Sequence, residues 1–284
     1  MLGWRLLHDE ALSARVAFLG RLLPHPSGAL DRDPIALVLA ALAVALGFVY
    51  LVAALAGARP RARLALLVLA STIVVAAPTL AFVTMGEITG RPYGQDGGVV
   101  QLPLAIDRIL SGQSPYGADY SDSMLGREAR VSDFWTEHGG NPILHHHAYL
   151  PGTHLLMMPF ALLARAAARP FDPRMVTLLA FALAGAMAFR LGVRPEAKLA
   201  AAAAVWINPL VYWQQIFGAN DILVVALLLA AVLLARRERL GAAAAVLGLA
   251  CATKQLAWPF APFLLVFLSG APSLRSLGSA PARG

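Results

Sequence analysis

The sequence is poor in charged residues, and the shortage is uneven along the chain. Only 14% of its 284 residues are charged and 58% are hydrophobic, against roughly 25% and 45–50% in soluble domains. Because about 20 apolar residues can cross a bilayer, the composition predicts an all-α, polytopic transmembrane protein. Four apolar runs hold no Asp, Glu, Lys, Arg or His: Pro34–Ala58, Leu64–Met85, Met175–Phe189 and Ile222–Leu234.

Other absences restrict the function. Cys251 is the only cysteine, which excludes a disulfide within the chain and a cysteine metal site. No Walker A, GxGxxG, CxxC or GxSxG pattern occurs, so soluble nucleotide chemistry is unsupported. The net charge is +7, but the arginines stand in short clusters beside apolar runs. Such clusters are typical of cytoplasmic flanks on anionic lipid and not of a nucleic-acid surface.

The chain divides into a membrane domain with two flanking segments. Residues 1–33 are expected to form an interfacial helix or a tail. The membrane domain is expected over residues 34–270. Residues 271–284 are rich in Ser, Gly, Ala, Pro and Arg and are expected to form a flexible tail. Later apolar runs, such as Leu199–Phe217, are further candidate spans.

One long polar segment, Gly86–His154, interrupts the apolar runs. It holds eight of the 16 acidic residues and five of the seven histidines. The positive-inside rule places the basic turn Arg59–Arg63 in the cytoplasm and therefore this loop outside. Within the loop, the helical spacing of apolar residues over Val99–Leu110 predicts an amphipathic helix on the membrane surface.

The run Tyr149–Leu163 is expected to be re-entrant or interfacial rather than a full crossing. This arrangement places two more basic turns, Arg190–Lys198 and Arg236–Arg239, on the cytoplasmic side. Pro159 in the middle of the run indicates a broken or re-entrant helix, with a kinked helix start as the alternative.

Polar residues gather near one face instead of mid-membrane, which favours chemistry at a membrane–water boundary over transport. Asp96, between Gln95 and Gly97, is a candidate general base, and an Asx-turn residue is the alternative. The three consecutive histidines His145–His147 cannot all face one ion. We therefore expect a hydrogen-bonding or anion-contacting role for one or two of them rather than a metal site.

Two further candidate binding elements lie after the loop, a segment and a single lysine. The segment Asn208–Asp221 combines amides, aromatics and a carboxylate, which suit sugar hydroxyls. It equally suits an interface belt in which Asn220 or Asp221 caps the next helix. Lys254 interrupts an apolar stretch, and it either pairs with a phosphate or extends to the interface.

In their order and spacing, these motifs resemble the pattern of the GT-C superfamily of membrane glycosyltransferases, most closely that of its bacterial α-mannosyltransferase-like branch. The sequence departs from that pattern by having a single proline at Pro151 and two apolar spans before the loop. The resemblance covers roughly Met85–Pro259 and rests on Asp96, Gly112 with Pro115-Tyr116, Tyr149 with Pro151, Gln215/Gly218/Asn220/Asp221, Arg236–Arg239 before Gly241, and Lys254.

The resemblance implies an inverting transfer of a sugar, in that branch mannose, from a polyprenyl-phosphate donor at the extracytoplasmic face of a bacterial plasma membrane. It implies Asp96 as general base, with Lys254 and a loop histidine holding the lipid phosphate. The implied partners are membrane lipid, the lipid-linked donor and a glycan or glycolipid acceptor, without nucleic acid. The implied substrate-binding residues are Tyr116, His146, His147, Tyr149, Gln215, Asn220, Asp221 and Lys254.

Three matters stay open from the sequence. No cofactor is certain, and a requirement for a divalent metal is undecided. A transporter or flippase of lipid-linked sugars is an alternative function. A catalytically inactive or truncated membrane assembly subunit is the third alternative.

Overall fold

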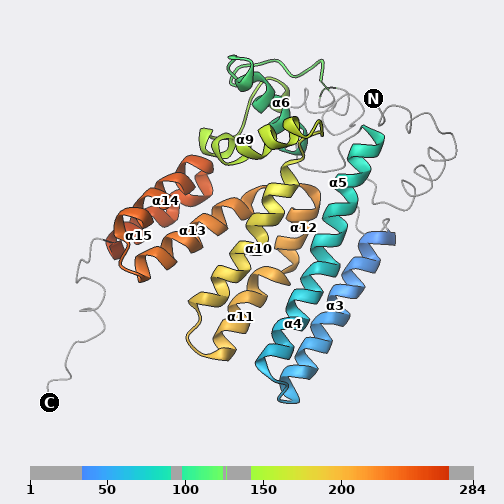
Figure 1. The fold of residues 1–284 in the computed structure, drawn as a ribbon, viewed down its shortest axis with the longest axis vertical. Coiled ribbons are helices and arrows are strands. Elements are labelled where there is room, and N and C mark those ends of the chain that lie inside the picture. The colour runs from blue at the N-terminus through green and yellow to red at the C-terminus, as the bar shows by residue number, and fades with distance from the viewer. Residues whose placement is uncertain (1–33, 91–97, 124–125, 127–141, 269–284) are drawn as a thin grey trace.

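The computed structural model describes residues 34–90, 98–123, 126 and 142–268, and these residues form helices without any β-strand (Figure 1). The predicted interfacial segment 1–33 and the tail 271–284 lie outside the described residues. The all-α prediction is confirmed for the described part of the chain.

The first two predicted spans form a helical hairpin. Helix α3 (Pro34–Leu55) is followed by α4 (Pro60–Ser71), which continues through the π-helical turn η2 (Thr72–Ala76) into α5 (Ala77–Thr89). The π turn comes just before Pro78, whose ring and missing N–H disturb the regular helical hydrogen bonds. The π turn accommodates this disturbance, and the helix runs without a break from Pro60 to Ile88.

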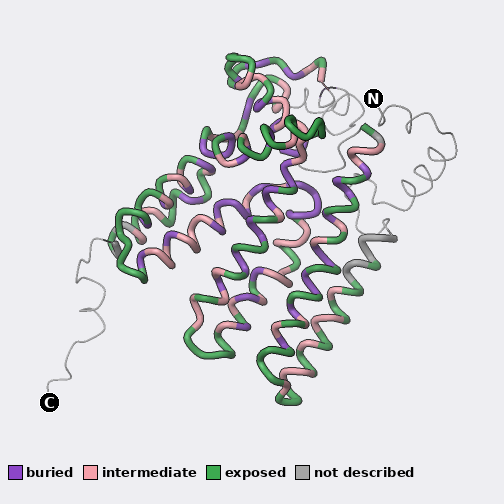
Figure 2. Tube along the Cα trace, in the orientation of Figure 1, coloured by how far each residue is buried: buried purple, intermediate pink, exposed green. Residues whose placement is uncertain are grey.

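Helix α10 (Pro173–Leu191) lies at the centre of the second group of helices. It packs against α11 (Pro195–Trp206) and α13 (Asp221–Arg236), and α13 packs in turn on α14 (Leu240–Thr253). Burial is concentrated on the facing sides of α10 and its neighbours, whereas the outer sides of α3 and α14 are exposed (Figure 2).

Two expected spans are interrupted in the structure. The run Leu199–Phe217 is not one helix, because α11 ends at Trp206 and α12 (Pro209–Phe217) starts afresh. Asn208 Oδ1 accepts a hydrogen bond from the Leu210 amide at 3.0 Å, and proline at the first helical position suits a new helix start. The last apolar run of the sequence, Leu256–Leu268, was a further expected span, and it divides between the 3-10 segment η4 (Gln255–Phe260) and α15 (Ala261–Leu268).

Two helices lie across one end of the bundle in Figure 1: α6 (Gly98–Leu110) and α9 (Pro151–Ala166). The 16 residues of α9 are fewer than the about 20 needed to span a bilayer, which agrees with an interfacial or re-entrant run. The helix nevertheless continues through Pro159, so the predicted break at this proline is wrong.

The amphipathic helix predicted over Val99–Leu110 is confirmed as α6, but the expected environment of its apolar face is wrong. Leu102 and Ile106 are fully buried in the main core beside Met157 of α9. The apolar face therefore packs on protein and not on membrane lipid. An amphipathic pattern in the sequence shows that a face is buried without showing which material covers it.

The three basic turns meet at one end of the bundle, which we call the basic end (Arg59–Arg63, Arg190–Lys198 and Arg236–Arg239). Arg63 forms an ion pair with Glu196 at 2.6 Å, which joins the first turn to the second. Arg236 Nη1 donates a hydrogen bond to the Leu191 carbonyl at 2.7 Å, which joins the third turn to the second. The predicted grouping of the basic turns is therefore confirmed as a grouping in space.

The opposite end, here called the loop end, comprises residues 98–123, 142–174, 215–221 and 253–255. Two ion pairs lie there: Arg165 of α9 pairs with Asp107 at 2.5 Å, and Arg169, just after α9, pairs with Glu87 of α5 at 2.7 Å. Asp107 is exposed and paired with arginine, as expected for a solvated residue.

Among the described residues, two helices are long and apolar enough to cross a membrane, Pro60–Ile88 and Pro173–Leu191, and the stretches Ala41–Leu55 and Leu240–Thr253 are apolar but shorter. The outer side of α3 exposes large apolar residues such as Phe48 and Leu55. These features are consistent with a membrane protein, while the number of crossings stays a prediction.

Candidate functional site

The predicted general base, Asp96, lies outside the described residues. In the sequence it comes two residues before Gly98, where α6 begins. The other predicted site residues all lie at the loop end.

Lys254, Asn220 and Asp221 are brought together where α14 ends and α13 begins. Lys254 Nζ donates a hydrogen bond to Asn220 Oδ1 at 3.0 Å and forms an ion pair with the Asp221 carboxylate. Lys254 and Asp221 are partly exposed, and Asn220 is buried. The three residues thus form one polar group that joins the two helices and reaches solvent.

Asn220 occupies the predicted N-cap position of α13, but its side chain does not cap the helix. Its oxygen instead accepts the hydrogen bond from Lys254. The buried Nδ2 atom of Asn220 has no hydrogen-bond partner among the described residues. A donor that is free beside a lysine is suited to bind an oxygen of a ligand.

The start of α9 is fixed directly on the end of α14. A Cβ atom at Gly152 would lie 2.6 Å from the Ala252 carbonyl carbon, so only glycine permits this approach. The Thr153 hydroxyl donates a hydrogen bond to the Thr253 carbonyl at 2.8 Å. The N-terminus of α9 is thereby held next to Lys254, and helix N-termini favour anions.

His147 and His154 form a buried pair at the start of α9. Their Nε2 atoms are 2.6 Å apart, and the residues are 2% and 3% exposed. Burial and the nearby His154 and His146 lower the pKa of His147 to about 4. Burial also lowers the pKa of His154. Both imidazoles are therefore neutral at neutral pH, and they offer hydrogen bonds rather than positive charge.

Tyr116 and Tyr149 complete this part of the site. The Tyr116 hydroxyl donates to the Tyr149 carbonyl at 3.0 Å. The Tyr116 ring lies edge-on to His147, with centroids 5.5 Å apart, and the Tyr149 ring is 5.6 Å from His147. Tyr116 is 45% exposed. It therefore separates the buried histidines from solvent.

The three consecutive histidines diverge, as predicted from their spacing. His145 and His146 are exposed, and His145 Nδ1 lies 3.4 Å from the Asp119 carboxylate. His146 contributes its carbonyl, which accepts a hydrogen bond from Gln101 Nε2 at 3.0 Å. The described residues contain no group of three or more His, Cys, Asp or Glu side chains placed to hold a metal.

Gln215 contacts a different group from Lys254. Its side chain is buried and donates to the Arg174 carbonyl at 3.3 Å. Arg174 is fully buried and forms an ion pair with Asp172 at 2.6 Å. At Gly218, where φ is +95°, a Cβ would lie 1.9 Å from Val99 Cγ2, so α12 can end against α6 only through a glycine.

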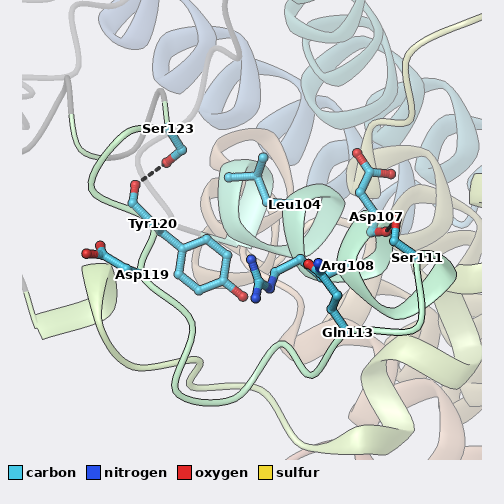
Figure 3. A pocket seen from close by; sticks show the side chains of 8 residues that line it. All are labelled: Leu104, Asp107, Arg108, Ser111, Gln113, Asp119, Tyr120 and Ser123. Atoms are coloured by element: carbon cyan, nitrogen blue, oxygen red, sulfur yellow. Dashed lines mark hydrogen bonds between the residues drawn. The ribbon is translucent and has the colours of Figure 1, made fainter.

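A small hollow of about 280 Å³ opens beside α6 (Figure 3). None of the predicted substrate-binding residues lines it, and we do not place the site there. Its wall includes Tyr120, whose ring lies 6.3 Å from that of His147. The lining residues are Leu104, Asp107, Arg108, Ser111, Gln113, Asp119, Tyr120 and Ser123.

Sequence reasoning missed Gln101, His154 and Arg174. Gln101 could have been found, because it is a polar residue on the otherwise apolar buried face of α6. His154 gave no periodic signal, since Pro151 and Gly152 start a new helix between it and His147. The Asp172-Pro173-Arg174 sequence signals a helix start but not the burial of an arginine.

The profile of glycosyltransferase family 87 matches residues 147–280, which is slightly less than half of the sequence. The matched part includes His147, the helices α9 to α15 and Lys254, and it does not include Asp96. No curated protein and no solved structure matches the chain. Over residues 147–280 the chain is thus similar to a GT-C-type family, which supports a membrane glycosyltransferase.

Proposed function

We propose that the protein is an integral membrane glycosyltransferase that moves a sugar, mannose in the branch it resembles, from a polyprenyl-phosphate donor to an acceptor hydroxyl. One structural observation supports the proposal beyond the family match. Lys254, with Asn220 and Asp221, lies at the same end of the bundle as the histidine pair and the start of α9. A cation and uncharged hydrogen-bonding groups are the recognition elements that a sugar phosphate requires.

The proposed orientation follows from the two ends of the bundle. Three basic turns lie at the basic end, and basic loops stay preferentially in the cytoplasm. The loop end would then face the extracytoplasmic side, where a polyprenyl-phosphate sugar presents its head group beside the membrane.

In the proposed reaction Asp96 acts as general base. The acceptor oxygen attacks the anomeric carbon of the sugar, the bond from this carbon to the phosphate oxygen breaks, and the acceptor's hydroxyl proton moves to the Asp96 carboxylate. The leaving group is the polyprenyl phosphate, which gains negative charge on the departing oxygen. Lys254, supported by the N-termini of α9 and α13, would stabilise that charge.

The proposal is tested with membranes that contain the protein and radiolabelled polyprenyl-phosphate mannose. We expect wild-type membranes to attach the label covalently to an acceptor, and Asp96→Asn to reduce transfer by roughly 100-fold or more at an equal amount of inserted protein. Covalent transfer by Asp96→Asn at the wild-type rate would remove Asp96 from the mechanism. Movement of intact donor across the membrane without covalent transfer would instead identify a flippase.

A further inference from the structure

We propose that His147 binds a sugar hydroxyl through its Nδ1 atom, and that His154 fixes His147 in the tautomer that this bond requires. The inference rests on the proposed glycosyl transfer and assigns a specific contact within that site. The shared ligand chemistry is a sugar hydroxyl, from either the donor or the acceptor.

The hydrogen bonds of the pair determine which nitrogen carries each proton. The two Nε2 atoms, 2.6 Å apart, can bond only if one of them is protonated and the other is not. The Pro151 carbonyl favours a proton on the His154 ring, and because Nε2 faces His147, the nitrogen available to this carbonyl is Nδ1. Neutral His154 then has a free electron pair on Nε2, so His147 must donate from its own Nε2.

This assignment leaves Nδ1 of His147 without a proton. The atom is buried and has no hydrogen-bond partner among the described residues, and a buried acceptor without a donor is unfavourable. Two neighbouring hydroxyls are engaged elsewhere, because Tyr116 donates to the Tyr149 carbonyl and Tyr120 donates to the Pro115 carbonyl at 2.9 Å. No other described group donates to the atom. The position therefore calls for a donor from outside this group.

A sugar hydroxyl matches this requirement better than a phosphate. A phosphate diester or a dianionic monoester has only oxygen acceptors, which a bare Nδ1 repels, whereas every sugar hydroxyl can donate. Of the tyrosines around His147, Tyr116 is exposed, whereas Tyr149 is partly buried and Tyr120 is buried. The way from solvent to the pair thus passes Tyr116, which a change of its side-chain torsion can open.

Two substitutions at His147 separate the proposed role from a structural one. His147→Gln keeps a donor near the Nε2 position toward His154 but removes the acceptor at Nδ1. His147→Asn places an amide oxygen near the Nδ1 position but loses the contact with His154. We expect His147→Gln to lower kcat/KM by roughly ten- to hundredfold, the size of a lost hydrogen bond, and His147→Asn to stay within about fivefold of wild type.

The loss in His147→Gln should be a rise in KM with kcat unchanged, because the contact is a binding contact. Separate titrations of polyprenyl-phosphate mannose and of octyl mannoside as acceptor probe show which substrate provides the hydroxyl. His145→Gln, at an exposed neighbour, is the control. Equal losses in His147→Gln and His147→Asn, or a fall in kcat at constant KM, would overturn the proposal.

A second measurement does not depend on transfer. Histidine-specific ¹⁵N NMR of the whole protein in nanodiscs should show an unprotonated Nδ1 on His147, and its resonance should shift when one of the two sugar probes is added. A protonated Nδ1, or a metal ion retained by wild type and lost from His147→Gln, would overturn the inference. If wild type shows the resonance shift but no covalent transfer, the proposed function fails and the binding contact stands.

Discussion

The two ends of the helical bundle treat polar side chains in opposite ways. Almost all charged residues of the basic end are exposed. At the loop end, polar groups are buried and joined by hydrogen bonds. Apart from Arg63, Ser71, Thr79 and Thr177, the buried polar residues of the described chain all lie there: Gln101, His147, Thr153, His154, Arg174, Gln215, Asn220 and Thr253.

In the proposed function, the basic end sets the orientation of the protein in the membrane and the loop end binds the substrate. Exposed arginines cost little to fold and suffice to keep a turn in the cytoplasm. Burying amides, imidazoles and a guanidinium lowers stability unless each group finds a partner. The loop end therefore depends on specific contacts, and substitutions there should have larger effects than the matched substitutions at the basic end.

The largest expected effect compares two arginine ion pairs. Arg174→Met leaves Asp172 without its buried partner and should lower the free energy of unfolding by about 3–5 kcal/mol, because Arg174 is fully buried. Arg63→Met breaks the pair with Glu196, whose side chain is 70% exposed, and should cost at most about 1 kcal/mol. Thermal unfolding in detergent measures both, and equal losses would contradict the contrast between the ends.

A smaller effect is expected on transfer when Lys254 is replaced. Lys254→Met removes the proposed phosphate contact and should raise the KM for the lipid-linked donor or lower kcat/KM by roughly 100-fold, as for a lost charged hydrogen bond. Lys198→Met at the basic end, where the ammonium lies 5.8 Å from the Phe189 ring, should leave transfer unchanged. Donor titrations in the radiolabel assay give both values, and an unchanged Lys254→Met would exclude the lysine from donor binding.

The histidine pair predicts how stability depends on pH. The pKa of His147 in the folded protein, about 4, is below the value of 6.5 for the unfolded chain. The unfolded state therefore takes up a proton first as pH falls below 6.5, and stability is lost between pH 6.5 and 4. The loss reaches about 2 kcal/mol at pH 5.

The groups that face His147 are His154, His146 and three tyrosines, Tyr116, Tyr120 and Tyr149. The tyrosines do not titrate in this range. Unfolding curves between pH 7.5 and 5 should thus be flatter for His147→Gln than for wild type. Identical pH dependence in the two proteins would show that the pair is not neutral in the folded state.

The last prediction changes no free energy and tests the sidedness itself. A cysteine at Ser121, at the loop end, should react from outside intact cells with an impermeant thiol reagent, and one at Arg237, at the basic end, should not. The native Cys251 is replaced by Ser in both variants. Equal labelling of the two sites would refute the proposed orientation while leaving the helix packing intact.

Much of the fold could be predicted because apolar runs and basic turns are local signals. The hairpin of α3 and α4, the helix α6 and the grouping of the three basic turns were all visible in the sequence. The break at Asn208 was missed because hydropathy alone joined two helices that a capping asparagine and Pro209 separate. The sequence pattern of α6 could not show that protein, and not lipid, covers its apolar face.

The individual residues of the candidate site could be predicted from the sequence, but most of the contacts between them could not. Lys254 contacts Asn220 and Asp221, three residues that were each visible in the sequence as candidates for substrate binding. The pairing of His147 with His154 crosses a helix start, and the buried Arg174 contacts Gln215 of α12 and the Phe82 ring of α5. Such contacts arise from packing between distant segments, which no local pattern encodes.

The contact of Gly152 with the end of α14 has a consequence for substrate selection. At this point backbone meets backbone, so the spacing between the histidine pair and Lys254 is not adjustable by a change of side-chain torsion. The distance between the histidine pair and Lys254 is therefore fixed by the backbone. In the proposed site, a sugar phosphate whose hydroxyl and phosphate are farther apart than this distance would lose one of the two contacts. The close approach at Gly152 would thus select substrates by the distance between these two groups.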